Sequence, residues 1–444
     1  MNILYISQYF HPEVCAPAAR VADLAREWVR AGHEVRILTG FPNHPEGVLH
    51  SDYRRQWRKG YGREERDGAK IYRTWLYPAA DRGLWGRSAN YCSFALSAAV
   101  AGPWIAPGNG VVIATSPQLL VGLTGYMVAR ARRLPFVFEV RDLWPQSLEA
   151  VGASSLLYRS LQRLADFLYL RADRIVVVGE WQRDSLIAAG VRPEKIAVVR
   201  NGAGDDFCLD PESRVGQALR EHTRNELRIA DRFVVAYAGT LGMAQGLETV
   251  LLAAERLRDR GEVVFLLIGE GAEREQLLER SRELRLTNVG FLAKQPREKV
   301  PAYLAAADVC VVPLRRREIF KTAIPSKMFE AMAAAKPVIL GVEGEAKEIL
   351  LEAQGGIAIP PDDSDALAKA ILRLLQRPEL GRALGANGRR AVREKYSRQQ
   401  QARAYLELLA GLVNTPRHHP VSDAPQAPEP TSANKPETLT LRKK

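Results

Sequence analysis

The segment from Thr322 to Glu330 holds the densest group of side chains that could do chemistry. Pro325 and Ser326 predict the start of a helix, where the first backbone N–H groups lack intrahelical partners and attract anions. Lys327 places a cation at the unfavourable end of the helix dipole, and a bound anion would explain that placement. Glu330, one turn later, could accept hydrogen bonds from two ribose hydroxyls. We therefore expect Ser326, Lys327 and Glu330 to bind a phosphate-bearing ligand; a solvated helix surface is the alternative.

Basic residues precede this predicted helix. Lys321 stands beside Thr322, and three consecutive arginines occupy positions 315–317. These cations could cover the phosphates of the same ligand, or they could simply be solvated. We include Lys321 and Thr322 in the predicted site.

Two glycine-rich turns follow apolar runs in the same half of the chain. The first turn is Ala238–Gly246 and the second is Ile268–Gly271. Such turns bring backbone N–H groups close to a pyrophosphate, a base or a ribose, although they are also common after strands that bind nothing. The residues expected to contact the ligand are Gly239, Thr240, Gln245, Gly269 and Glu270.

In the first half of the chain, Arg141 and Asp142 directly follow the predicted strand Phe136–Val140. Ligands of open parallel α/β sheets bind beyond the carboxyl ends of the strands. The two residues could therefore hold a sugar hydroxyl, and Asp142 could take the proton of an attacking hydroxyl. A purely structural Arg–Asp ion pair is the alternative.

The loop that begins at Gln8 feeds a predicted helix at 18–31. The small residues Ala16 and Ala18 would let a phosphate approach the backbone at that helix start. The loop lacks the Gly-x-Gly-x-x-Gly pattern of dinucleotide-binding turns, which argues against a dinucleotide cofactor. An ordinary strand–helix turn is the alternative.

The loop Thr39–Gly47 follows the second predicted strand and contains two prolines and two glycines. His44 could donate a hydrogen bond to the phosphate of a second substrate, and we place Asn43 in the same loop contact. A polar turn without a ligand is the alternative.

Short apolar runs alternate with longer helical segments along most of the chain, which is typical of parallel strands joined by crossover helices. The predicted strands of the first half are Ile3–Ser7, Val35–Thr39, Lys70–Thr74, Val111–Thr115, Phe136–Val140, Arg174–Val178 and Ile196–Val199. Those of the second half are Phe233–Ala238, Val263–Ile268, Val289–Leu292, Val309–Pro313, Pro337–Leu340 and Gly356–Ile359. We therefore predict an α/β fold with two Rossmann-like, doubly wound parallel sheets.

A charged stretch without strands, residues 212–231, separates the two sets. We predict an N-terminal domain at 1–205 and a C-terminal domain at 206–397, followed by a last helix at about 398–412. From 414 to 444 the composition shifts to proline, serine, threonine and charged residues, which is typical of a disordered tail.

The chain carries 63 Lys and Arg against 51 Asp and Glu, a formal net charge of +12. A basic surface attracts phosphates, or it serves solubility alone.

The four cysteines are scattered, with no Cys-x-x-Cys pair and no grouped histidines, so we expect no metal and a reducing, cytoplasmic location. The N-terminus does not resemble a signal peptide, and no stretch reaches the ~20 apolar residues that cross a bilayer.

Residues 54–87 hold ten Lys or Arg against four Asp or Glu, and the mostly apolar segment Tyr91–Ala106 follows. Basic residues beside a short apolar helix suit an interfacial contact with an anionic membrane. We therefore predict that residues 54–106 contact the inner-membrane surface; a core helix beside a polar loop is the alternative. The basic stretch lacks a nucleic-acid recognition motif and a stacking platform, so we expect no nucleic-acid partner.

Seven motifs together make the chain resemble glycosyltransferase family 4 over nearly everything up to about residue 412. They are Tyr9-Phe-His-Pro-Glu, Thr39-Gly-Phe-Pro-Asn-His-Pro-Glu-Gly, Arg141-Asp-Leu-Trp-Pro, Ala172-Asp-Arg, Asn201-Gly, Ala244-Gln-Gly-Leu-Glu-Thr and Ile324-Pro-Ser-Lys-Met-Phe-Glu-Ala-Met. Within that family the chain resembles bacterial envelope-polysaccharide enzymes of the colanic-acid and O-antigen N-acetyl-L-fucosaminyltransferase kind.

The resemblance implies a GT-B fold, in which two domains face each other across a cleft and the last helix crosses back to the first domain. It implies a nucleotide-sugar donor, with UDP favoured, bound mainly by the second domain. It implies a lipid-linked or polysaccharide-precursor acceptor on the first domain, at the cytoplasmic face of the inner membrane. It further implies retention of configuration, no metal and no cofactor besides the donor.

The sequence departs from the family pattern at four positions. Family members commonly carry Glu-x7-Glu, but here Thr322 occupies the first position and Glu330 the second. Thr240 and Gln245 stand where many members have an arginine and a lysine, and Arg141 stands where many have a histidine. The groups expected to neutralise the departing diphosphate are therefore helix N–H groups, Lys321 and Lys327.

Two other functions fit the same architecture. A nucleotide-sugar epimerase would need several acids and a histidine in the cleft, for which Asp142, His44 and Glu330 are few. A non-catalytic, membrane-associated subunit would account for the missing family residues.

Overall fold

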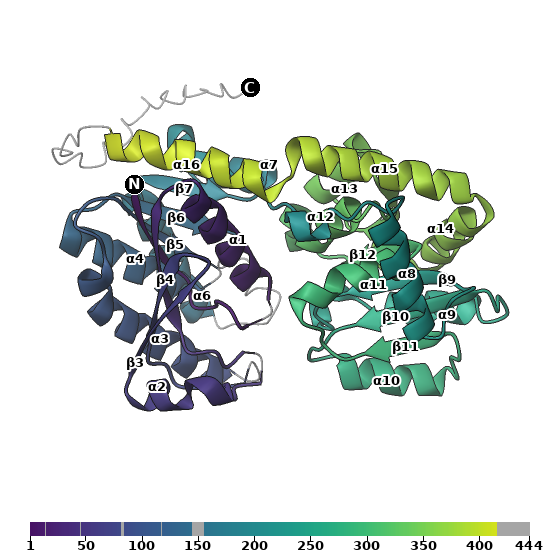
Figure 1. Ribbon diagram of the computed structural model, residues 1–444. Helices are drawn as coiled ribbons and strands as arrows, with labels where there is room; N and C mark the ends of the chain where they lie inside the picture. The colour runs from purple at the N-terminus through teal and green to yellow at the C-terminus, as the bar shows by residue number, and fades with distance from the viewer. Residues whose placement is uncertain (14, 45, 81–83, 117, 144–154, 415–444) are drawn as a thin grey trace, which may run out of the picture.

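The computed structural model describes residues 1–13, 15–44, 46–80, 84–116, 118–143 and 155–414. Their strands form two separate sheets, one of eight and one of six strands. Figure 1 shows these sheets in two lobes that lie side by side, each sheet with helices packed against it. The predicted α/β class with two doubly wound sheets is confirmed. The predicted tail falls outside the described residues, except for its first residue.

The first lobe is built on the eight-stranded sheet, in the order β3-β4-β2-β1-β5-β6-β7-β8. Its strands are β1 (Asn2–Ile6), β2 (Glu34–Gly40), β3 (Tyr61–Arg66), β4 (Ala69–Thr74), β5 (Val111–Thr115), β6 (Phe136–Val140), β7 (Arg174–Val177) and β8 (Ile196–Val198). Its helices are α1 (Ala16–Arg30), α2 (Arg54–Arg58), α3 (Leu84–Ile105), α4 (Leu119–Arg132), α6 (Ser155–Arg171) and α7 (Glu180–Ala188). The central strand β1 is buried from Ile3 to Ile6, because apolar cores cover both faces of the sheet.

The second lobe is built on the six-stranded parallel sheet, in the order β11-β10-β9-β12-β13-β14. Its strands are β9 (Phe233–Ala238), β10 (Val263–Ile268), β11 (Val289–Leu292), β12 (Val309–Pro313), β13 (Val338–Gly341) and β14 (Gly356–Ala358). Its helices are α8 (Arg214–Glu226), α9 (Glu248–Arg256), α10 (Arg274–Glu283), α11 (Val300–Ala306), α12 (Ser326–Ala333), α13 (Glu345–Glu352), α14 (Ser364–Gln376) and α15 (Pro378–Lys395). The change of sheet falls between the end of β8 and the start of β9.

The structure adds one strand that the sequence pattern did not predict. β3 pairs antiparallel with β4 at the edge of the first sheet, and its residues are mostly polar and exposed. An edge strand buries little apolar surface, so it shows no apolar run. The missed signal is the turn Asp67-Gly68, whose φ angles are 49° and 77°. Asp-Gly in a two-residue loop with positive φ at both positions is typical of a tight hairpin.

The last helix, α16 (Arg398–Asn414), returns to the first lobe and packs on α1. Figure 1 shows α16 above α1, after α15 on the second lobe. The indole N–H of Trp28 donates to the carbonyl of Ala402 at 3.0 Å, and the Trp28 ring meets Tyr405 edge-on at 5.3 Å between centroids. The chain therefore leaves the second lobe after α15 and ends in a helix that packs on the first lobe.

A glutamate of the second lobe also binds a helix start of the first. The carboxylate of Glu345 accepts hydrogen bonds from the backbone N–H groups of Glu180 and Trp181, both at 2.9 Å. These are the first two residues of α7, whose N–H groups need partners outside the helix. No helix within the described ranges is long and apolar enough to cross a membrane.

Candidate active site

The start of α12 is where the predicted phosphate-binding group lies. Pro325 occupies the N-cap position of α12. Its side chain has no group that could accept a hydrogen bond from the first N–H groups of the helix. The ammonium group of Lys327 donates to the hydroxyl of Tyr237 at 2.6 Å and lies 4.3 Å from the centre of that ring. The hydroxyl of Tyr237 in turn donates to the carbonyl of Thr240 at 2.6 Å. Lys327 thus reaches from α12 to the turn after β9.

Gly239 confirms how closely Lys327 approaches that turn. A Cβ atom built on Gly239 would lie 2.7 Å from Nζ of Lys327, which is closer than real Cβ contacts. Burial lowers the pKa of Lys327 to about 8, and the negative charge of Glu330 opposes this only in part. An ammonium group that is poorly solvated and held beside a glycine turn is suited to a multiply charged anion.

Glu330 is half-buried one turn along α12, among charges that come from both lobes. Burial raises the pKa of its carboxyl group, whereas Arg297, Arg398 and Lys327 act in the opposite direction. Arg297 itself donates to Asp23 of α1 at 2.8 Å, across the two lobes. Glu330 therefore lies where the two lobes meet.

The backbones of the two glycine-rich turns pack closely against each other. Gly239 and Gly269 have φ angles of 149° and 148°. A Cβ atom on Gly269 would lie 1.9 Å from the carbonyl oxygen of Gly239, and one on Gly271 would lie 2.3 Å from that of Leu241. Close packing of backbone on backbone accounts for Gly269 and Gly271 without a ligand, so these glycines are weaker evidence for a site than the sequence reasoning assumed.

Glu270, and the turn that contains Gln245, are held by contacts within the second lobe. Glu270 pairs with Arg274 at 3.2 Å. Arg315 donates to the carbonyl of Met243 at 2.7 Å and to Glu273 at 3.0 Å, which fixes the turn that contains Gln245. The guanidinium group of Arg315 thus binds this turn in the described structure.

Lys321 and Thr322 lie in the short 3-10 helix Glu318–Thr322 before α12. Lys321 pairs with the exposed Glu318 at 2.9 Å, and the hydroxyl of Thr322 donates to the carbonyl of Ile319 at 3.0 Å. The contacts of the described residues do not bring Lys321 to Lys327. The two lysines that the sequence grouped together therefore have separate environments.

In the first lobe, Arg141 follows β6 and has a guanidinium group with unused donors. Its backbone is fixed, since its N–H donates to Ser116 at 2.8 Å and its carbonyl accepts from Gln182 at 2.8 Å. Nε and Nη1 of Arg141 are buried, and neither has a hydrogen-bond partner in the described part of the chain. Asp142 remains reachable from solvent, but the surrounding protein raises the pKa of its carboxyl group, while Arg141 lowers it. Trp144 lies outside the described residues.

The start of α1 faces positive charge from both lobes. Cys15 is its N-cap residue and makes no side-chain cap hydrogen bond. Arg141 and Lys294, the latter from the loop after β11, both act to lower the pKa of the Cys15 thiol, although burial dominates and raises that pKa to about 12. Ala16 is exposed at this helix start, but Ala18 is buried at 2 % exposure. The Ala18 side chain is thus turned away from solvent, and the approach of a phosphate to the backbone at this helix start stays a prediction.

Asn43 and His44 are held by residues that the sequence reasoning did not assign. Their backbone N–H groups donate to one carboxylate oxygen of Glu13, at 3.0 and 2.9 Å. The side-chain amide of Asn90 donates to that of Asn43 at 3.1 Å, and the His44 ring packs against Tyr9 with centroids 4.7 Å apart. Glu13 stands in one of the quoted family motifs, which was the only signal for it in the sequence.

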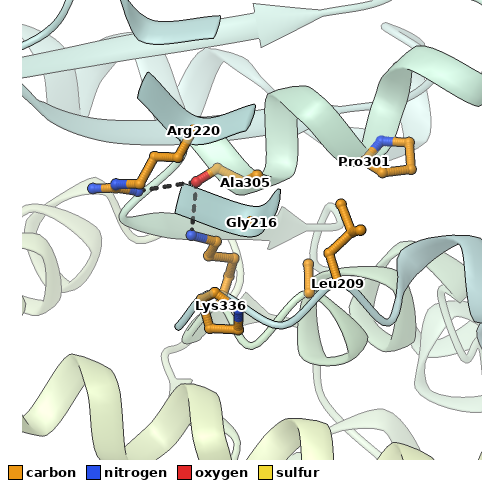
Figure 2. Close-up of a pocket in the computed structure, with 8 residues that line it drawn as sticks. Leu209, Gly216, Arg220, Pro301, Ala305 and Lys336 are labelled. Atoms are coloured by element: carbon orange, nitrogen blue, oxygen red, sulfur yellow. Dashed lines mark hydrogen bonds between the residues drawn. The ribbon is translucent and has the colours of Figure 1, made fainter. Parts of the chain in front are cut away.

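A small cavity elsewhere in the second lobe has no part in this site. Figure 2 shows Arg220 and Lys336 donating to the carbonyl of Ala305 inside it, at 3.0 and 2.8 Å. Its other lining residues include Leu209, Gly216 and Pro301. Both cations satisfy carbonyl groups at the end of α11, and none of the predicted site residues borders the cavity.

Comparison with known proteins identifies the family. A glycosyl transferase 4-like domain matches residues 16–202, and the glycosyl transferases group 1 model matches residues 220–391. The glycosyltransferase WbjE of Pseudomonas aeruginosa is 30% identical over 298 residues, which are 65% of this chain and 71% of WbjE. The chain belongs to the family 4-like glycosyltransferases. The colanic acid biosynthesis glycosyl transferase WcaI of Escherichia coli K12 is 25% identical to this glycosyltransferase over 395 residues, 85% of this chain and 93% of WcaI.

Solved structures agree on the fold of this glycosyltransferase. HepE of Anabaena has a TM-score of 0.68 and 17% identity, and the match covers 92% of this chain and 99% of HepE. Sucrose-phosphate synthase of Thermosynechococcus elongatus has a TM-score of 0.68 and 21% identity, over 92% of this chain and 99% of that enzyme. The fold is therefore the GT-B arrangement that the motifs implied.

Proposed function

We propose that this glycosyltransferase moves a sugar from a UDP-sugar to a lipid-linked acceptor in the biosynthesis of an envelope polysaccharide. The names of WbjE and WcaI support the reaction class, and that of WcaI supports polysaccharide biosynthesis. HepE, which shares the fold, was solved with UDP and glucose and with UDP-glucose, which supports a UDP-sugar as the donor. We propose further that the sugar keeps its anomeric configuration and that no metal is needed.

The observation that carries this proposal is the position of Lys327. Its ammonium group lies between the start of α12 and the turn at Gly239, with a tyrosine hydroxyl as its hydrogen-bond partner. A diphosphate there could accept hydrogen bonds from N–H groups at the helix start and would face the full charge of the lysine. When the bond between the sugar and the diphosphate breaks, negative charge grows on the diphosphate oxygen, and Lys327 would stabilise it.

The residues of the first lobe would complete the transfer. Arg141 offers buried N–H donors that have no partner among the described residues, so it could bind a phosphate or sugar oxygen of the donor from the opposite side. Asp142 is the proposed acceptor of the proton that the attacking hydroxyl loses, and its raised pKa suits that role. Glu330 would accept hydrogen bonds from the ribose hydroxyls.

Replacement of Lys327 tests this proposal. Lys327→Ala should lower the turnover number for transfer to extracted lipid acceptors by roughly 100-fold, the usual cost of losing one group that stabilises developing charge. Lys347→Ala is the matched control, because Lys347 is exposed on α13. Thermal shifts with UDP-, GDP- and dTDP-sugars identify the nucleotide, since the ligand that binds the folded state raises its melting temperature. Near-normal turnover of Lys327→Ala would refute the proposed role.

A membrane surface is the proposed location of the acceptor, and α3 provides the apolar contact. Trp85 and Trp104, at its two ends, are 90% and 89% exposed, with Leu96 and Val100 exposed between them. The exposed side chains of the described part of α3 carry no charge. Exposed apolar surface of this length marks a contact site rather than ordinary solvent exposure.

Basic residues adjoin this apolar face. Trp57 of α2 stacks on Trp75 at 6.2 Å between ring centroids, and the hydroxyl of Ser97 on α3 donates to the carbonyl of Trp75. This links α2, where Arg54, Arg55, Arg58 and the following Lys59 are exposed, to α3. Cations beside an apolar helix face match the anionic headgroups of the inner membrane at its cytoplasmic side.

Vesicle binding tests the membrane proposal. We expect the protein to sediment with phosphatidylglycerol vesicles and much less with phosphatidylcholine vesicles. The double variant Trp85→Ser, Trp104→Ser should lose at least roughly 10-fold in affinity, because two aromatic anchors leave the interface. The control is Leu351→Ser, an exposed apolar residue of the second lobe. Equal binding to both vesicle types, or unchanged binding by the double variant, would contradict the proposal.

A further inference from the structure

Glu13 lies buried in the loop between β1 and α1, where an unpaired carboxylate would be costly. Its side chain is 8% exposed. One of its oxygens accepts both hydrogen bonds from the consecutive backbone N–H groups of Asn43 and His44, at 3.0 and 2.9 Å. These donors come from the loop after β2, thirty residues further along the chain. A single carboxylate therefore joins two loops at the carboxyl edge of the first sheet.

Other contacts hold the loop that Glu13 binds as well. Asn43 is also bound through its side chain, which accepts from Asn90 of α3 and donates to the carbonyl of Phe41 at 3.0 Å. The carbonyl of Asn43 accepts from the N–H of Gly47 at 2.7 Å. His44 is held through its backbone by Glu13, and its ring packs on Tyr9. Loss of the Glu13 carboxylate would leave two adjacent N–H groups without their charged acceptor.

The charges around Glu13 come from three segments. Burial raises the pKa of its carboxyl group to about 7, while the N–H groups of Asn43 and His44 and the charge of Arg73 on β4 oppose this rise. Arg73 is itself bound to the carbonyls of Gly40 and His11 and to Glu64, so its charge is fixed in place. The Cys15 thiol, on the same loop as Glu13, is kept neutral by burial. The His44 imidazole also lies at this contact.

We propose that Glu13 is a positioning residue that holds Asn43 and His44 in the orientation needed to bind the acceptor. The proposal rests on the proposed function, since it makes Asn43 and His44 the acceptor-binding residues of this loop. Charge-assisted hydrogen bonds to a carboxylate are roughly twice as strong as neutral ones, so the ionised form of Glu13 orders the loop. Binding of the acceptor phosphate or sugar hydroxyls by His44 and Asn43 then depends on Glu13, which itself touches no substrate.

Acceptor kinetics separate this role from a merely structural one. In Glu13→Gln, kcat/KM for the acceptor should fall roughly 10-fold, through a higher KM, because the loop is less well oriented. The stabilisation by UDP in a thermal-shift assay should be unchanged. Glu13→Asp, which keeps the charge on a shorter side chain, should recover part of the loss. Glu46→Gln is the matched control, because Glu46 is exposed on the same loop. Equal losses for donor and acceptor, or none, would overturn the proposal.

The pH profile gives a second readout. Acceptor kcat/KM of the wild type should rise with pH through about 7, as Glu13 ionises. In Glu13→Gln, the acceptor kcat/KM should show no such rise. At pH values below about 7 it should resemble that of the wild type. A step that persists unchanged in Glu13→Gln belongs to another group, such as Asp142, and overturns this part.

Hydrogen exchange tests the contact without any activity. The backbone N–H groups of Asn43 and His44 should exchange faster in Glu13→Gln than in the wild type or in Glu46→Gln. If the wild type binds no nucleotide and transfers no sugar, the proposed function fails, but the exchange comparison still decides whether Glu13 orders the loop. Unchanged protection in Glu13→Gln would overturn the inference. If Glu13→Gln fails to fold, two other measurements replace it. One is exchange of the same N–H groups in Glu13→Asp. The other is their exchange in the wild type at about pH 8 and pH 6, corrected for intrinsic rates, where protection should be lost at the lower pH.

Discussion

Lys327 carries a positive charge in a place that disfavours it. Its ammonium group forms no salt bridge with any described residue, and its hydrogen-bond partner is a neutral hydroxyl. Folding lowers its pKa from 10.5 to about 8, so between these values the folded chain binds fewer protons than the unfolded chain. This lysine therefore opposes folding at neutral pH, and its unfavourable contribution disappears as the pH rises through that range. A residue that costs stability in the free protein is typical of a binding site.

Binding of UDP should be coupled to proton uptake by Lys327. At about pH 8.5 most Lys327 side chains in the free protein are neutral, and a bound diphosphate would restore the charge. We expect uptake of about 0.8 proton for each UDP bound, from the pKa of about 8. The measurement is calorimetric titration in buffers of different ionisation enthalpy. In Lys327→Met the binding enthalpy should no longer depend on the buffer; the same dependence in both proteins would contradict the assignment.

The sequence predicted where α12 starts, but not which residues its side chains contact. Pro325, Ser326 and Lys327 predicted the helix start from residue type and order alone, because helix ends have local signals. The contact of Lys327 with Tyr237 joins residues 90 positions apart, and that of Glu13 with Asn43 joins residues 30 apart. Such contacts depend on how the sheets bring loops together, which no local pattern specifies.

At the scale of elements, every predicted strand is present, because most of them are buried runs of apolar residues between turn signals. The edge strand β3 was missed since it has no apolar face to show. The basic and apolar segment 54–106 proved to contain α2, β3, β4 and α3, with α3 starting before the apolar run. The glycines after β9 and β10 were predicted correctly as turns, but close packing of those turns on each other explains Gly269 without a ligand.

The packing of these turns gives a stability prediction. Gly269→Ala should lower the free energy of unfolding by about 2 kcal/mol or more, because the new methyl group would meet the carbonyl of Gly239 at a φ of 148°. Gly261→Ala is the control, since nothing lies within 4 Å of its Cβ position, and should change stability by less than about 0.5 kcal/mol. Urea unfolding measures both. A neutral Gly269→Ala would mean that the two turns can separate without cost.

At the scale of the whole molecule, the two lobes are joined by specific ionic contacts as well as by the chain. Asp23 of α1 accepts from Arg297 and lies 3.3 Å from Nε of Arg398, and both arginines act on Glu330. Glu345 binds the start of α7 on another part of the interface. The predicted ligand groups of α12 and of the first lobe are thus held in one arrangement, with the proposed donor residues on the second lobe and the proposed acceptor residues on the first.

The most direct test is a crystal structure of the full chain with UDP. The account predicts that a diphosphate oxygen lies about 3 Å from Nζ of Lys327 and accepts from the first N–H groups of α12, with the ribose near Glu330. UDP bound away from α12, or a start of α12 that stays covered by protein while UDP binds elsewhere, would contradict it.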